Sequence, residues 1–297
     1  METESNKWLY WLLKPLSMLP LRVLFLISDV CVYPLVYWVV KYRRAVVRSN
    51  LASSFPLLTT KELRRLEKRF YRHFCDCFME TIRVLSMSDE EGMRRMKCIN
   101  TEVFTRSGPQ GKGTLIVLGH YGNWEYQVIL QLYMPKEWKQ EPISVYRPLK
   151  NKAFDYLYQR IRTHFGGKIV TKDGTYRKVI QLRRDNIPGV FGMVSDQTPS
   201  RKNIQYWTPF LNHDTPMYSG ADRMARQTGY AVVYADVRKL SRGYYQTEYI
   251  LLSDDPQSEA PDAITERYAR AMEQTIVRDP AYWLWTHKRW KHKRNND

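Results

Sequence analysis

The sequence predicts an α/β fold with a mixed, largely parallel sheet flanked by helices, preceded by an N-terminal membrane-anchoring helix. Two observations lead to this prediction. Short apolar runs alternate with amphipathic helical patterns over most of the 297 residues, as is typical of strand–helix units that build a parallel sheet. Before them lies one long apolar stretch that basic residues follow directly. We therefore divide the chain into an anchoring or interfacial helix, residues 1–45, and an α/β domain, residues 46–297.

The composition is that of a folded and strongly basic protein. Apolar residues make up 43% of the chain, which is enough for a core and argues against disordered, collagen-like and disulfide-stapled proteins. The 47 Lys and Arg residues exceed the 30 Asp and Glu residues, and the formal net charge of +17 favours anionic partners such as nucleic acid, anionic lipid or an acidic carrier. The 9 Trp and 21 Tyr residues favour a membrane surface among these partners.

The cysteines predict neither a disulfide framework nor a zinc site. They are irregularly spaced and form no CxxC pair, so we expect reduced thiols in a compartment that faces the cytosol. The four residues are Cys31, Cys75, Cys77 and Cys98.

The first apolar stretch runs from Trp8 to Val40. Its residues 23–40 carry one formal charge, Asp29, and approach the length of about 20 residues at which a helix crosses hydrocarbon. The basic residues that follow favour a cytosolic C-terminal side, and no small-residue cleavage site indicates a signal peptide. These basic residues are Lys41, Arg43, Arg44 and Arg48. A buried core helix is the alternative that Asp29 and Pro34 keep open, and a spanning helix and a helix in the membrane plane fit the pattern equally well.

The α/β domain opens with a long amphipathic helix predicted over residues 60–86. Thr59 and Glu62 have the spacing of a capping box, and apolar residues then recur at steps of three and four. Strands are predicted at residues 114–119, 143–146, 169–170, 189–195, 231–237 and, as a hairpin-like edge, 246–252. Helices are predicted near residues 124–134, 151–163, 175–184, 218–228 and 262–278.

The chain ends in a tail, residues 282–291, that mixes aromatic and basic side chains. Three of its residues within eight positions are tryptophans, at 283, 285 and 290. A solvated basic end is one interpretation of this tail. The density of tryptophan favours the other, which is packing or membrane contact.

The strongest chemical signal is the buried strand at residues 114–119 that runs into His120. In α/β sheets, functional side chains gather beyond the carboxyl ends of strands. Glu125 lies five positions on, which is about 140° around a continuous helix, so the two side chains meet only if the chain turns between them. Gly122 and Asn123 supply that turn, and with Asn123 as the N-cap, Glu125 falls in the first helical turn facing the imidazole. We expect Glu125 to orient His120 as a general base; a loop histidine bonded to a carbonyl is the alternative.

Polar residues follow two further predicted strands. Arg147 follows one of them, and Asp196 and Gln197 follow the other, so three strand ends deliver histidine, arginine and aspartate to one crevice. The helix after Arg147 carries Arg160 and Arg162, which offer cations for an anionic substrate or a developing oxyanion. Each arginine alone is more often a solvated surface residue, and the cluster is what favours a site.

Other catalytic patterns are missing from the sequence. It has no GxSxG elbow, no cysteine beside an expected base, and no HExxH or other metal-ligating triad. Phosphate-loop and dinucleotide-binding fingerprints are also missing. We therefore expect direct, base-assisted attack on an activated substrate, with no metal and no cofactor.

These features together resemble the late (secondary) acyltransferases of lipid A biosynthesis, within the HxxxxD/E glycerolipid acyltransferase superfamily. The likeness covers nearly the whole chain and includes the apolar N-terminal segment. Its motifs lie at residues 119–125, 146–151, 196–197, 209–211 and 282–291. One departure is Thr198-Pro199-Ser200, where the family commonly has an acidic or amide residue and then glycine; this leaves the choice of acceptor open.

The resemblance implies an enzyme on the cytoplasmic face of the inner membrane of a Gram-negative cell. It would transfer a fatty acyl chain from acyl carrier protein to a hydroxyl of a lipid A precursor, without an acyl-enzyme. The implied catalytic residues are His120 as base, Glu125 as its partner, Arg162 and Asp196, with Arg160 as the alternative to Arg162. Substrate contacts are expected from Arg147, Asn123, Arg160 and Gln197. The anionic membrane surface is a further expected partner, and nucleic acid is not.

Two other functions remain open on the sequence alone. The first is the same chemistry on a lysophospholipid, glycerol phosphate or an aminoacyl lipid; glycerophosphate-type relatives usually have Asp where this chain has Glu125, which favours lipid A. The second is a basic, membrane-attached protein that binds nucleic acid or other partners without catalysis. No helix-turn-helix, RRM or zinc pattern supports that second function.

Overall fold

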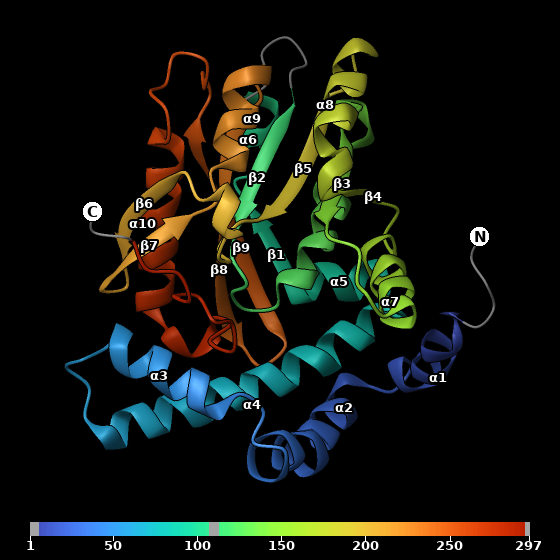
Figure 1. Ribbon diagram of the computed structural model, residues 1–297. Coiled ribbons are helices and arrows are strands. Elements are labelled where there is room, and N and C mark those ends of the chain that lie inside the picture. The colour runs from blue at the N-terminus through green and yellow to red at the C-terminus, as the bar shows by residue number, and fades with distance from the viewer. Residues whose placement is uncertain (1–5, 107–112, 295–297) are drawn as a thin grey trace.

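The structure, a computed structural model, describes residues 6–106 and 113–294, which form a seven-stranded sheet and a separate two-stranded hairpin (Figure 1). The strand order in the large sheet is β1-β9-β8-β2-β5-β3-β4. Its strands are β1 (Met96–Ile99), β2 (Thr114–Leu118), β3 (Glu141–Tyr146), β4 (Lys168–Thr171), β5 (Gly189–Val194), β8 (Ala231–Ser241) and β9 (Tyr244–Ser253). Within this sheet, neighbouring strands run parallel, apart from the antiparallel pair of β8 and β9. The predicted mixed, largely parallel sheet is confirmed.

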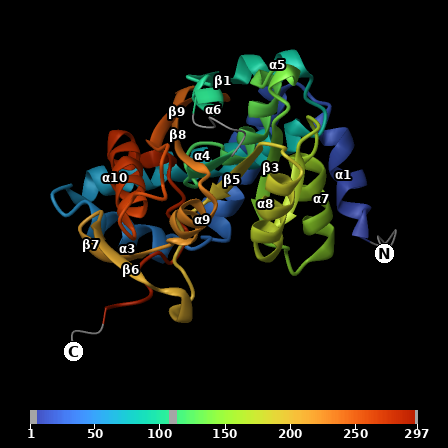
Figure 2. The same ribbon diagram turned by 90° about the horizontal axis from the view of Figure 1, so that it is seen from above.

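Helices cover both faces of this sheet (Figures 1 and 2). One face packs against α8 (Thr175–Arg184), α9 (Gly220–Thr228) and α10 (Ala263–Arg278). The other packs against α5 (Asp89–Arg95), η4 (Trp124–Tyr133) and α7 (Lys152–Arg162). Because both faces are covered, the central strand β2 is buried along its whole length, which explains its unbroken apolar run.

The two-stranded hairpin was not predicted from the sequence. It pairs β6 (Tyr206–Phe210) with β7 (His213–Met217) around Leu211 and Asn212, which both have positive φ, as a tight hairpin turn requires. Pro209 and Pro216 interrupt the two strands, and proline is a signal against a strand. The short β1 was missed too, because its four residues alternate buried and exposed positions and include Lys97.

The long helix α4 (Thr60–Val84) crosses below the sheet in Figure 1. Its predicted capping box is present, since the Glu62 carboxylate accepts from the Thr59 N–H at 2.7 Å and the Thr59 hydroxyl accepts from the Glu62 N–H. The buried side of α4 carries Asp76 and Glu80 besides its apolar residues. This helix therefore brings polar groups to its neighbours as well as apolar packing.

The N-terminal segment consists of α1 (Trp8–Ser17), α2 (Leu21–Ile27) and two π-helical turns, η2 (Ser28–Val32) and η3 (Leu35–Val39). Pro20 separates α1 from α2. The stretch from Leu21 to Val39 is long and apolar enough to cross a membrane, and only 17% of it is buried inside the molecule. So low a burial argues against the alternative of a core helix.

The remaining elements are short. They are α3 (Arg44–Ser54), α6 (Val103–Arg106) and the 3₁₀ turns η5 (Lys136–Trp138), η6 (Lys172–Gly174), η7 (Arg201–Asn203) and η8 (Pro280–Tyr282). The predicted helices and strands agree with the observed ones to within a few residues, although the predicted helix at 124–134 has 3₁₀ geometry.

Candidate active site

The centre of the site is the turn that joins β2 to η4. His120 lies two residues after β2, and Asn123 caps η4 by accepting a hydrogen bond from the Glu125 N–H at 3.2 Å, as predicted. Gly122 has a φ of +59°, and a Cβ atom there would lie 3.0 Å from Val237 and 3.2 Å from Tyr245. Only glycine fits this turn without strain, because the backbone is left-handed and approaches the sheet closely.

Asp196 from the neighbouring strand end holds the imidazole of His120. Leu118 of β2 pairs with Val194 of β5, so His120 and Asp196 each lie two residues beyond paired strand ends. The Asp196 Oδ1 lies 2.6 Å from the His120 Nδ1, and its Oδ2 accepts from the His120 N–H at 2.8 Å and from the Trp283 indole at 2.7 Å. Both oxygens of the Asp196 carboxylate therefore accept hydrogen bonds.

The environment keeps Asp196 ionised. Burial alone would raise the pKa of its carboxyl, but the charge of His120 and the hydrogen bonds from His120 and Trp283 lower the pKa to about 2. An ionised Asp196 accepts the proton on Nδ1, so the lone pair of the neutral ring lies on Nε2. The Gln197 amide donates to that Nε2 at 3.2 Å, and the His120 side chain is 17% exposed. This imidazole is an oriented, accessible base.

Glu125 has a different partner from the one expected. Both of its oxygens accept from Arg162 of α7, at 3.0 Å from Nε and 2.7 Å from Nη2, in a largely buried bidentate pair. The first turn of η4 presents Glu125 to α7, where the planar guanidinium offers two parallel donors. The expectation that Glu125 contacts and orients the imidazole is therefore wrong. The carboxylate that contacts the His120 Nδ1 belongs to Asp196.

The other predicted arginines are exposed, and neither takes part in the two pairs. Arg147 is exposed just after β3, which neighbours β5 in the sheet. Arg160 is also exposed, and its guanidinium lies 6.0 Å from the ring centre of Tyr10 in α1. Arg160 and Arg162 are about 200° apart around their helix, so only Arg162 faces Glu125.

The C-terminal tail contributes groups that the sequence analysis did not assign to the site. Besides the Trp283 indole, the Leu284 N–H donates to the His120 carbonyl at 3.0 Å, and the Gly122 N–H donates to the Tyr282 carbonyl. The His287 Nε2 accepts from the Thr198 N–H at 3.2 Å, and burial lowers the pKa of His287 to about 4. The packing interpretation of the tail is thus confirmed for this part, and its density of tryptophan was the available signal.

Helix α4 supports the turn from behind. Glu80 is fully buried, and one of its oxygens accepts from Asn123 at 3.0 Å and from the Tyr245 hydroxyl at 2.8 Å. Burial raises the pKa of the Glu80 carboxyl. Asn123 therefore caps η4 and ties it to α4. The signal for Glu80 was a carboxylate on the inner face of a predicted amphipathic helix.

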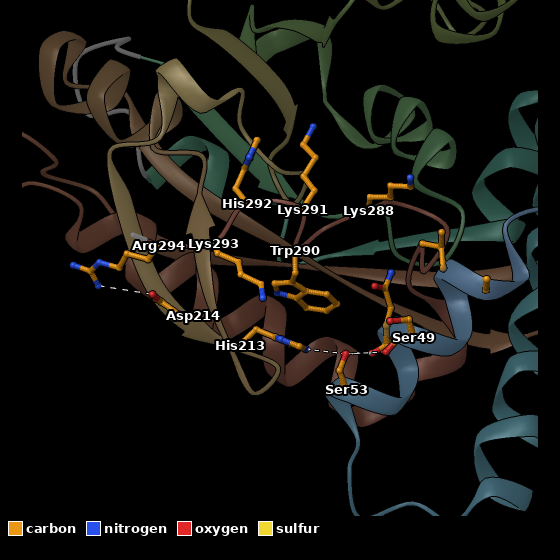
Figure 3. Close-up of a pocket in the computed structure, with 13 residues that line it drawn as sticks. Ser49, Ser53, His213, Asp214, Lys288, Trp290, Lys291, His292, Lys293 and Arg294 are labelled. Atoms are coloured by element: carbon orange, nitrogen blue, oxygen red, sulfur yellow. Dashed lines mark hydrogen bonds and ion pairs between the residues drawn. The ribbon is translucent and has the colours of Figure 1, made fainter. Parts of the chain in front are cut away.

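Two hollows near these groups differ in size and chemistry. A cavity of about 50 Å³ touches Arg162 between η4 and the sheet, which is room for one or two water molecules and too little for a fatty acyl chain. A groove of about 790 Å³ lies between α3 and the C-terminal tail, where the Trp290 ring stacks on His213 (Figure 3). Lys288, Lys291 and Lys293 line this groove, and His120 does not.

No group of three or more His, Cys, Asp or Glu side chains among the described residues is arranged to hold a metal ion. The groups that the described residues offer here are a lone pair on His120 Nε2 and the guanidinium of Arg162.

Comparison with known proteins identifies related chains. The family described as "Bacterial lipid A biosynthesis acyltransferase" matches residues 4–292. The chain is 22% identical over 295 residues to a lipid A biosynthesis lauroyltransferase of Escherichia coli (strain K12), covering 95% of this chain and 92% of the relative. It is 23% identical over 265 residues to the lipid A biosynthesis palmitoleoyltransferase of the same organism, covering 84% of this chain and 79% of the relative. A lipid A biosynthesis acyltransferase of Shigella flexneri matches with the same identity and coverage.

Proposed function

The chain belongs to the bacterial lipid A biosynthesis acyltransferase family, and from this premise we propose that it transfers a fatty acyl chain from acyl carrier protein to a hydroxyl of a lipid A precursor. The family supplies the reaction class and implies the lipid A precursor as substrate. The observation that carries the proposed mechanism is the pair of His120 and Asp196, with a proton-accepting Nε2 beside exposed surface.

The proposed step is a direct transfer. The acceptor hydroxyl gives its proton to His120 Nε2 while its oxygen attacks the thioester carbonyl carbon, and the carbonyl electron pair moves to oxygen. The tetrahedral intermediate then collapses, the C–S bond breaks, and the thiolate takes the proton from Nε2. Asp196 stabilises the imidazolium between the two transfers, because both of its oxygens already face donors on His120 and Trp283.

We assign Arg162 to the oxyanion and Glu125 to the positioning of Arg162. A guanidinium has five N–H donors, and Glu125 engages Nε and Nη2, so Nη1 can meet an anion. Burial alone would lower the pKa of Arg162, but Glu125 raises it above its ordinary value, so the cation persists. Asn123 holds Glu125 in place by capping η4.

Substrate contacts are proposed for the exposed groups nearby. Gln197 donates to Nε2, and an acceptor hydroxyl would take its place on that nitrogen. Arg147 and Arg160 are exposed cations suited to phosphate groups of the lipid. The formal net charge of +17 is complementary to an acidic carrier protein and to the cytoplasmic face of the inner membrane, where we place the enzyme.

The test is transfer of labelled acyl chains by the detergent-solubilised full chain. Acyl carrier protein is the donor, and a tetra-acylated lipid A precursor and lysophosphatidate are offered as competing acceptors. We expect product on the lipid A precursor, and a loss of roughly 10²–10⁴ in kcat/KM for His120→Ala. Asp173→Asn, an exposed carboxylate of η6, is the matched control and should keep full activity.

The two carboxylates are separated by their pH profiles. Asp196→Asn removes the counter-charge of the imidazolium and should move the acid limb of kcat/KM, whereas Glu125→Gln should lower kcat/KM without moving that limb. Product only on lysophosphatidate would contradict the lipid A precursor as the acceptor. The absence of any product from folded protein would contradict the proposed activity. A stable acyl adduct on the protein during turnover would overturn the direct transfer.

A further inference from the structure

The N-terminal segment, residues 8–40, lies along α4 from Lys68 to the C-terminal end of that helix. At one end, the Ser17 hydroxyl lies 2.6 Å from that of Ser86, and Arg83 donates to the Ser17 carbonyl at 2.8 Å. In the middle, Ser28 donates to Asp76 at 2.9 Å. Near the far end, the Tyr71 hydroxyl donates to the carbonyl of Tyr42, just beyond the segment, at 2.5 Å. The segment therefore runs antiparallel to α4 in continuous contact.

An ion pair fixes the centre of the apolar stretch to the α/β domain. Asp29 is the ninth of the 19 residues from Leu21 to Val39, and both of its oxygens accept from Arg242, at 2.7 and 2.8 Å. Arg242 lies in the turn between β8 and β9 and also binds Asp76 through Nε and Nη2. Glycine follows it at 243, where a Cβ atom would lie 3.0 Å from α2.

This attachment is incompatible with a crossing helix. If Leu21–Val39 spanned a bilayer, Asp29 would lie near its midplane, and Arg242 and Asp76 would be drawn to the same depth. The neighbouring helix α4 would follow them into hydrocarbon, although it carries exposed charges such as Lys68 and Arg72. Charged groups and polar turns are excluded from that region unless protein covers them.

The exposed residues of the segment are mainly apolar and aromatic, and Arg22 and Asp29 are the charged ones among them. Its exposed large apolar residues extend over the whole stretch: Trp8, Trp11, Leu12, Met18, Leu19, Val23, Leu26, Val30, Leu35, Trp38, Val39 and Val40. Indole rings and aliphatic side chains on one face, with polar contacts on the other, are typical of helices that lie at a lipid–water boundary.

Cations of α4 lie beside the aromatic rings of the segment. Lys68 lies 5.8 Å from the ring centre of Trp38, and Arg72 lies 5.6 Å from that of Tyr33. The first turns of α4 add further basic residues that line an open groove, namely Lys61, Arg64 and Arg65. Basic residues beside an apolar face complement the negative surface of anionic lipid.

We infer that residues 8–40 lie flat in one leaflet of an anionic bilayer, with the exposed tryptophan face in the acyl boundary and the cations of α4 at the headgroups, and do not cross the bilayer. This inference concerns how the chain meets lipid and holds whatever reaction the enzyme performs. It also places the carboxyl end of β2 near the lipid, because the turn after β2 contacts α4 through Asn123 and Glu80.

The first test locates the N-terminus of the full chain carrying an epitope tag at each end. Sealed inside-out vesicles of the bacterial inner membrane, with the cytoplasmic face outward, are treated with protease, and a periplasmic marker reports that they are sealed. A flat segment leaves both ends outside, so we expect both tags to be lost. Protection of the N-terminal tag together with loss of the C-terminal tag would overturn the inference.

The second test removes the central attachment. Hydrogen exchange of the backbone amides of residues 21–39 is measured in vesicles of phosphatidylethanolamine and phosphatidylglycerol. Asp29→Ala leaves the pair of Arg242 and Asp76 intact, and we expect roughly tenfold or faster exchange as the docking bond is lost. Arg242→Gln should have the same effect. The control is Arg238→Gln in β8, where the arginine is paired with Asp236 and Glu248, and this variant should match the unmodified chain. A spanning helix would lose an unfavourable charge in Asp29→Ala, so unchanged or slower exchange would overturn the inference.

Discussion

The two ends of the chain have similar compositions and opposite surroundings. Both combine tryptophan with apolar and basic residues, yet Trp11 of the N-terminal segment is 64% exposed and Trp285 of the C-terminal tail is completely buried. The buried tryptophans of the tail have their indole N–H groups satisfied inside the protein: Trp283 donates to Asp196 and Trp285 to the Pro280 carbonyl. The difference teaches that composition alone does not decide the burial of such a segment. In this chain the tryptophans are buried where the fold supplies hydrogen-bond acceptors for their indole N–H groups, and they are exposed elsewhere.

The two ends also differ in their distance from the candidate active site. The tail contacts the His120 turn directly, through the Trp283 indole and the Leu284 N–H. The N-terminal segment contacts α4 and the β8–β9 turn instead. Changes in the tail should therefore alter stability and activity together, whereas changes on the outer face of the N-terminal segment should alter lipid binding alone.

The largest effect is expected from Trp285→Ala. Removing a completely buried indole leaves a cavity, and the free energy of unfolding should fall by about 3–5 kcal/mol. Urea unfolding in detergent, followed by circular dichroism, measures this change. A loss below about 1 kcal/mol would contradict the view of the tail as core.

Trp283→Phe should have the next largest effect. It keeps an aromatic ring and removes the hydrogen bond to the Asp196 carboxylate, so the free energy of unfolding near neutral pH should fall by about 1.5–3 kcal/mol. Asp196 stabilises the fold when ionised, because its pKa is lowered from 3.8 to about 2, and this stabilisation is lost as the pH falls through that range. The difference between variant and unmodified chain should therefore shrink below about pH 4. A difference that grows on acidification would contradict the assigned hydrogen bond.

Ser17→Ala tests the inner side of the N-terminal segment. The buried Ser17 hydroxyl bonds to Ser86 and to the Lys14 carbonyl, both at 2.6 Å. Its loss should weaken the attachment of α1 to the domain by about 1 kcal/mol. Faster proteolysis between α1 and α4, with unfolding of the α/β domain unchanged, is the expected observation. Equal proteolysis rates would show that this contact does not dock α1.

The smallest effect on stability is expected from Trp11→Ala. The side chain is mostly exposed, so the free energy of unfolding should change by less than about 0.5 kcal/mol. Partition of the full chain onto vesicles with anionic lipid should fall roughly tenfold, since an indole leaves the acyl boundary. A loss of stability like that of Trp285→Ala would instead place Trp11 in a core and remove the contrast between the two ends.

Much of the fold could be predicted because its signals are local. The period of α4, the capping box at Thr59 and Glu62, and the buried run of β2 each depend on residues close in sequence. The β6–β7 hairpin could not be predicted in this way, because Pro209 and Pro216 mimic a loop. The contacts that hold it come from distant parts of the chain, namely α3, α10 and the C-terminal tail.

In the candidate active site too, the residues could be predicted from local signals, but the long-range contacts between them could not. His120, Asp196, Glu125 and Arg162 were all identified as candidates, and the structure joins them in two pairs. Local spacing favoured Glu125 as the partner of His120, whereas the observed partner lies 76 residues away. That contact depends on β2 and β5 being neighbours in register, which is a property of the sheet and not of either motif.

The ion pair of Asp29 and Arg242 also has a consequence for biosynthesis. The two residues are 213 positions apart. A ribosome adds roughly 5–20 residues per second, so Arg242 emerges on the order of ten to forty seconds after Asp29. During that interval the carboxylate at the centre of the apolar helix does not yet have Arg242 as its counter-ion. The ion pair that fixes the helix to the α/β domain can therefore form only late in synthesis, after the β8–β9 turn has been made.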